Sequence, residues 1–154
     1  MHAPSPLIIS LTSFTLVVWA LAFWRGGAAE RWGAAIVAGN QILTMIFAYV
    51  VGQKSQGPIG LMVQMTLDGA AAGALLFVLL RFGRPWLGVA MLLYAAQFAL
   101  HSVYLVGEIK KNYLHVLLNN LNFVAIHLSL LVGTVQHWSR QAKAARSAAG
   151  APAP

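Results

Sequence analysis

The sequence contains no cysteine, and only three of its 154 residues are acidic. The absence of cysteine excludes disulfides, thiolate metal sites and cysteine nucleophiles. Charged residues make up only 8% of the chain, whereas a soluble protein usually has about 25%. Hydrophobic residues make up 59%, and the mean hydropathy is +0.72. This composition predicts an integral membrane protein, and the continuous apolar runs favour helices over the alternating strands of a barrel.

Five apolar segments are separated by short loops that contain glycine, proline or basic residues. We expect five transmembrane helices, over residues 7–24, 33–51, 59–80, 86–107 and 114–138. Together they form one domain over residues 1–138. The first segment is interpreted as a retained helix rather than a cleaved signal peptide, because no positive charge precedes it. The basic, Ala/Pro-rich tail over residues 139–154 is predicted to be disordered.

Basic residues are distributed unevenly between the two sides of this predicted bundle. One side carries Arg25, Arg31, Arg81, Arg84, Arg140, Lys143 and Arg146, and the other carries Lys54, Lys110 and Lys111. Since the more positive loops stay in the cytoplasm, we expect the N-terminus outside and the C-terminus in the cytoplasm. The net charge of +7 then has a topological explanation, and no nucleic-acid partner is predicted.

A stripe of polar residues runs along the fourth segment. Tyr94, Gln97, His101, Tyr104 and Glu108 are spaced three, four, three and four residues apart. On an α-helix this spacing places all five side chains on one face. The segment therefore has one face suited to lipid and one face suited to polar contacts.

Polar residues of four segments fall at similar depths, in the half of the bilayer nearest the outside, when depth is counted at about 1.5 Å per residue. Asp68 is the only acid inside a segment, and a carboxylate there costs several kcal/mol unless it is protonated, paired or hydrated. We expect the third and fourth segments to face each other, Gln64 and Asp68 against Gln97 and His101. The predicted ligand or ion pocket comprises Asp68, His101, Gln97, Gln64, Asn40, Asn119, Asn120, Asn122 and Tyr104. The alternative is that these residues only hold the helices together, at about 0.6–2 kcal/mol per hydrogen bond.

The remaining histidines and tryptophans have simpler interpretations. His101 and His127 differ in predicted depth by about 10 Å, which is unfavourable for a bis-histidine haem. No helical pair of metal-ligand residues at the usual spacing supports a metal site. His115 and His137 are expected to be solvated near the membrane surfaces. The five tryptophans are expected to form interfacial belts.

The arrangement of a short leading segment, ERWGA, a mid-chain Asp and an RPW turn resembles small bacterial inner-membrane proteins. That resemblance implies a location and no function. We expect a non-enzymatic accessory or binding subunit of a larger membrane assembly, in contact with lipid and with a membrane-protein partner or a second copy. The alternatives are a small oligomeric transporter or channel that uses Asp68 as its proton or ion site, and a haem-binding electron carrier. No nucleophile–base pair or metal motif predicts an enzyme, and the sequence names no cofactor.

Overall fold

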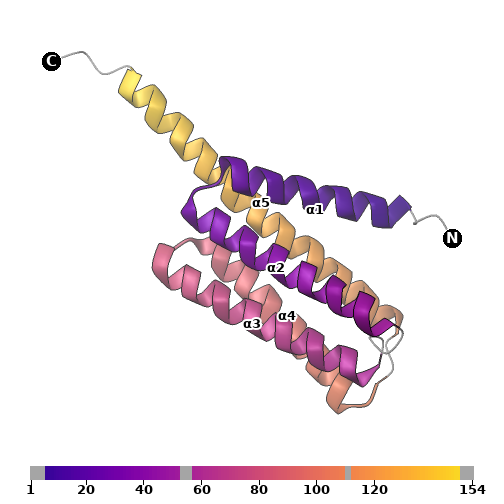
Figure 1. Ribbon diagram of the computed structural model, residues 1–154. Helices are drawn as coiled ribbons and strands as arrows, with labels where there is room; N and C mark the ends of the chain where they lie inside the picture. Colours follow the sequence, from indigo (N-terminus) through magenta and orange to yellow (C-terminus); the bar gives the residue numbers. More distant parts are fainter. Residues whose placement is uncertain (1–5, 53–56, 110–111, 150–154) are drawn as a thin grey trace.

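The computed structural model describes residues 6–52, 57–109 and 112–149. Within these ranges the chain forms five helices, drawn in Figure 1: α1 Pro6–Arg25, α2 Ala28–Val51, α3 Pro58–Phe82, α4 Pro85–Val106 and α5 Tyr113–Ala149. The helix ends follow local chemistry. Gly83 adopts a left-handed φ of 61° after α3 and donates its N–H to Leu79 O. Pro85 then begins α4, where its missing N–H costs nothing.

Four of these helices, α2 to α5, are long and apolar enough to cross a membrane. α1 is shorter over its apolar part, Ile9–Arg25. The prediction of an all-helical protein with membrane-compatible segments is therefore confirmed in this coarser form. The helix bounds lie within a few residues of the predicted segments, except that α5 continues well beyond residue 138.

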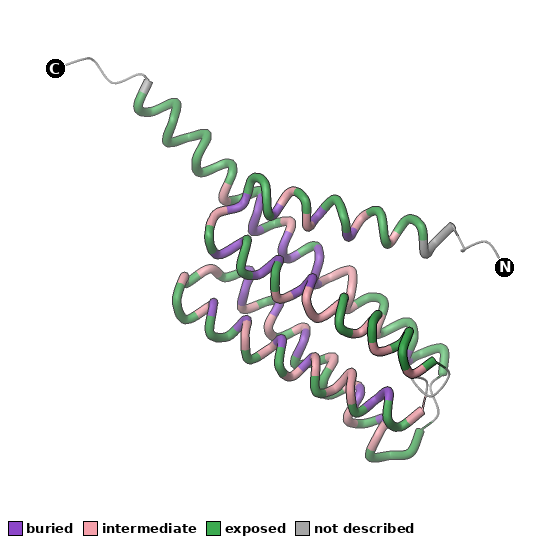
Figure 2. The backbone as a smooth tube through the Cα atoms, in the orientation of Figure 1, coloured by how far each residue is buried: buried purple, intermediate pink, exposed green. Residues whose placement is uncertain are grey.

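The helices form an up-and-down bundle in which consecutive helices run in opposite directions (Figure 1). α3 packs most extensively against α4, and α4 against α5, while α1 contacts α5 and α2. Figure 1 shows α1 inclined to the bundle, so that its N-terminal part diverges from the other helices. Exposed residues occur along all five helices (Figure 2), and many of them are large and apolar, among them Leu80, Val106 and Tyr49. Such a surface suits a lipid environment.

Trp86 of α4 contacts both α2 and α5, near the end of the bundle that holds the C-terminus of α5. Its indole N–H donates to Glu30 Oε1 of α2 at 3.3 Å. Its ring packs against Gly33 of α2 and Gly133 of α5, where an added Cβ would collide with it. Glu30 also accepts the backbone N–H of Gly27 at 3.0 Å, as in half of a capping box. The carboxylate is thus buried with hydrogen-bond partners from α4 and from the turn before α2.

Several sequence-based interpretations are wrong at this level. Trp86 does not belong to an interfacial belt, because its side chain is buried against α2 and α5. His115 is buried rather than solvated, since it faces α4 from the first turn of α5. α1 and α2 are separated by only two glycines.

The tail is also different from its prediction up to Ala149. α5 remains helical through this stretch, although its side chains are exposed. The reason is that Ala, Arg, Lys and Gln have high intrinsic helix propensity and the preceding helix supplies the nucleus. Residues 150–154 lie outside the described residues.

The packing of Trp86 against Gly133 predicts that Gly133→Ala destabilises the protein. The new Cβ would lie 2.5 Å from the indole, so Trp86 must shift, at a cost of about 1–3 kcal/mol in the free energy of unfolding. Unfolding in mixed detergent micelles, followed by circular dichroism, measures the change. Gly39→Ala is the matched control, because a Cβ there meets nothing within 4 Å. Equal free energies of unfolding for Gly133→Ala and Gly39→Ala would contradict this role of Trp86 packing.

Candidate functional site

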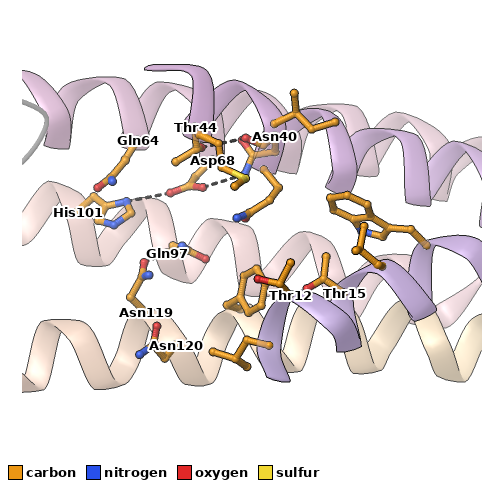
Figure 3. A pocket seen from close by; sticks show the side chains of 17 residues that line it. Thr12, Thr15, Asn40, Thr44, Gln64, Asp68, Gln97, His101, Asn119 and Asn120 are labelled. Atoms are coloured by element: carbon orange, nitrogen blue, oxygen red, sulfur yellow. Dashed lines mark hydrogen bonds and ion pairs between the residues drawn. The ribbon is translucent and has the colours of Figure 1, made fainter. Parts of the chain in front are cut away.

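Asp68 is the centre of a hydrogen-bonded group that joins three helices. Its side chain is buried on α3. Oδ2 lies 2.8 Å from Nδ1 of His101 on α4. Oδ1 lies 3.4 Å from Nδ2 of Asn40 on α2, which donates to it. The expected contact of the third and fourth segments through Asp68 and His101 is therefore present, and Figure 3 shows both interactions as dashed lines.

The local helix geometry explains how these side chains meet. Asp68 lies one turn after Gln64 on α3, and His101 lies one turn after Gln97 on α4. α3 and α4 are antiparallel neighbours joined by a two-residue turn, and Asp68 and His101 lie at similar distances from that turn, so they come to a similar level. His101 is 2% exposed, and its pairing with the carboxylate offsets the cost of burying both groups.

A cavity of about 420 Å³ lies beside this group (Figure 3). All five helices contribute to its lining. Of the predicted site residues, the structure brings together Asp68, His101, Gln97, Gln64, Asn40, Asn119 and Asn120 around it. Gln41 and Thr44 of α2 add further polar groups, and Leu16, Ile42, Met45 and Phe123 add apolar ones. The cavity therefore combines a polar wall with an apolar one.

Asn122 does not line this cavity but belongs to an amide network between α4 and α5. Its Nδ2 donates to Gln97 Oε1 at 2.9 Å and to Leu93 O at 2.7 Å. Gln97 Nε2 in turn donates to Asn119 Oδ1 at 2.8 Å. The amide of Gln97 is thus held on both sides. These contacts resemble the polar glue between membrane helices more than a free ligand site.

Tyr104 is also separate from the cavity lining. It is buried, and its hydroxyl donates to Asn112 Oδ1 at 2.8 Å. Its ring meets His115 edge-on at 4.6 Å between centroids, and His115 lies 5.4 Å from His101. The aromatic groups therefore connect His101 to the turn between α4 and α5.

The sequence-based site omitted the contribution of α1. Thr12, Thr15 and Trp19 line the cavity from that helix (Figure 3 labels the two threonines). Their spacing of three and four residues is a readable signal, because it places them on one helical face. Composition does not identify these three residues, because single hydroxyl and indole groups are inconspicuous in an apolar segment.

Several buried polar atoms at the cavity have no hydrogen-bond partner among the described residues. They are Thr15 Oγ1, Trp19 Nε1, Asn40 Oδ1 and His101 Nε2. Buried polar groups are normally paired, so each unpaired one asks for an explanation. All four belong to residues that line one cavity, so unpaired donors and acceptors from three helices gather around it.

The arrangement suits hydrogen bonding and proton exchange better than metal binding. The Asp68–His101 pair can share a proton, because both atoms are titratable and 2.8 Å apart. Within the described residues, no group of three or more His, Asp or Glu side chains could hold a metal ion. His127 lies among Phe14, Trp19 and Phe123, whereas the ring contact of His101 is with His115. The two histidines thus belong to different clusters.

A scan of protein-family models finds no match to this chain, and searches of curated proteins and of solved structures also find none.

The buried pair predicts a measurable coupling between Asp68 and His101. We expect Asp68→Asn and His101→Gln each to destabilise the protein, and the double variant to lose less than their sum by about 0.5–3 kcal/mol. Unfolding free energies of the four proteins in mixed micelles give this value. Thr134→Val is the control partner for Asp68, since Thr134 bonds only to its own helix, at Leu130 O. Strict additivity for Asp68 and His101 would contradict the pairing.

Proposed function

We propose that this protein spans the bacterial inner membrane five times, with its N-terminus outside and its C-terminus in the cytoplasm. Four apolar helices of sufficient length support membrane insertion. Arg25 at the end of α1, Arg81 at the end of α3 and the basic end of α5 lie toward the same end of the up-and-down bundle, which supports the orientation. α1 is the proposed fifth membrane-spanning helix, because it packs on α5 and α2 and the rest of its surface is largely apolar.

The cysteine-free chain allows a direct test of this topology. Tyr113→Cys and Ser147→Cys place single thiols at opposite ends of α5, both at exposed positions. A membrane-impermeant maleimide is expected to label Tyr113→Cys in intact cells and Ser147→Cys only after lysis. A protease-sensitive tag on the N-terminus should be cut from outside. The reverse labelling pattern would overturn the proposed orientation. A tag that is protected from protease in intact cells would contradict the proposal that α1 is a fifth membrane-spanning helix.

We propose further that the protein is a non-enzymatic binding or accessory subunit of a larger membrane assembly, and that its ligand occupies the cavity beside Asp68. One observation carries this proposal: four buried polar atoms without a hydrogen-bond partner among the described residues, in Thr15, Trp19, Asn40 and His101 of three helices, belong to residues that line one cavity. Helix-packing glue alone would leave such groups paired with each other, as Gln97 is with Asn119 and Asn122. The small size and the extensive exposed apolar surface favour a partner in the bilayer.

Isolation from membranes in a mild detergent tests the subunit proposal. Native mass spectrometry of the complex is expected to show a second protein or a second copy of this chain. Gly73→Cys provides a reporter for a second copy, because Gly73 is exposed and a Cβ there meets nothing within 4 Å. Disulfide-linked dimers would identify self-association through α3. A monomer in native mass spectra, with no cross-link in membranes, would contradict the assembly.

The buried Asp68–His101 pair also favours a second candidate, a small transporter or channel with Asp68 as its proton or ion site. Intramembrane carboxylates commonly mark such pathways. Under this alternative, proteoliposomes would show a pH-dependent flux that Asp68→Asn abolishes. Under the binding proposal, wild-type and Asp68→Asn vesicles leak protons and ions equally slowly. A flux dependent on Asp68 would therefore replace the binding proposal.

A further inference from the structure

The rim of the cavity shows how a ligand reaches it. Leu16 of α1 is 56% exposed, and Ile42 and Met45 of α2 are 48% and 60% exposed. All three also line the cavity. Apolar side chains of α1 and α2 therefore form part of the exposed rim, together with the exposed Thr12 of α1 and Asn120 of α5. A ligand that enters between these side chains comes from the hydrocarbon layer, so it is lipid-soluble.

The charges of the lining indicate an uncharged head group. Of the described residues that line the cavity, Asp68 is the only carboxylate, and none is Lys or Arg. Asp68 already has His101 and Asn40 as partners. An anion would find no cation to neutralise it, and a cation would compete with His101 for the same carboxylate. Burying an unpaired charge in this environment is costly.

The unpaired atoms require a ligand that both donates and accepts hydrogen bonds. The indole Nε1 of Trp19 is a donor only, and Oδ1 of Asn40 is an acceptor only. When Nδ1 of His101 donates its proton to Asp68, Nε2 of the neutral ring is an acceptor. The hydroxyl of Thr15 can act in either sense. A phenolic O–H or a comparable hydroxyl satisfies this mixed set.

Aromatic side chains add a preference for a flat ring. Trp19 and Phe123 both line the cavity, and both lie against the ring of His127, with centroids 6.2 Å and 4.3 Å from it. Aromatic walls of this kind hold planar rings in offset or edge-on contact. A cavity of about 420 Å³ is large enough for a single substituted ring, while a lipid tail would leave between α1 and α2.

We propose that the cavity binds the head group of an isoprenoid quinol, a neutral aromatic ring with two hydroxyl oxygens on a lipid tail. The hydroxyls donate to His101 and Asn40 and accept from Trp19 and Thr15. The proposal concerns binding alone and includes no electron transfer. It rests on the cavity being a ligand site, as proposed above, and adds the class of ligand.

The test compares binding of decylubiquinol to the full-length protein in phosphatidylcholine nanodiscs with its partition into empty nanodiscs. Bound quinol is measured by extraction and chromatography under anaerobic conditions. Saturable binding in excess of the empty discs is expected. The double variant Thr15→Val/Trp19→Phe, which keeps an aromatic ring at position 19 but removes two hydrogen-bonding groups, should bind at least about tenfold more weakly, since each tenfold is about 1.4 kcal/mol. Unchanged circular dichroism of the variant shows that its fold is retained.

Thr66→Val is the matched control, because Thr66 is exposed on α3 and bonds only to Met62 O of its own helix. It is expected to bind decylubiquinol as the wild type does. Farnesol, a lipid alcohol without a ring, should not displace the quinol at equal concentration. Quinol retention no greater than in empty discs, equal binding by the Thr15→Val/Trp19→Phe variant, or full displacement by farnesol would each overturn the quinol assignment. If a partner still co-purifies in that case, the ligand class is wrong but the proposed subunit role stands.

Discussion

A carboxylate inside an apolar bundle must be hydrogen-bonded, and this requirement organises the middle of the protein. Asp68 meets it through His101 of α4 and Asn40 of α2. Because His101 and Asn40 come from different helices, the two hydrogen bonds of Asp68 together fix the rotation of α2, α3 and α4 about their axes. The polar side chains one turn away on the same faces are then brought to the cavity as well. The site and the packing of α2, α3 and α4 are thus parts of one arrangement.

The end of the bundle that holds the C-terminus of α5 meets the same requirement in a different way. Glu30 is buried there with Trp86 and the N–H of Gly27, and Gly33 and Gly133 admit the indole between helices. This cluster has its polar atoms paired and holds α2, α4 and α5 together. At the cavity, by contrast, four buried polar atoms lack partners among the described residues. The difference separates a structural polar cluster from a candidate binding site.

The position of α1 decides whether the cavity is open to lipid. α1 contacts α5 and α2 but diverges toward its N-terminus (Figure 1). The cavity is lined both by exposed apolar side chains of α1 and α2 and by polar side chains, of which Asp68 and His101 are buried. In the proposed membrane setting, this bundle presents hydrogen-bonding groups to a molecule within the bilayer. That combination is the physical basis of the binding proposal.

The apolar segments and the common depth of Asp68, His101, Gln64 and Asn119 follow from the sequence alone, because hydropathy and the helical rise per residue are local properties. Only the tertiary structure decided which polar groups are paired. In the folded protein the amide of Gln97 is hydrogen-bonded to Asn119 and Asn122, and His115 is buried. Thr15 and Trp19 of α1 line the cavity. These outcomes depend on how each helix is rotated and which helix lies beside it, and depth along a segment carries no information about either.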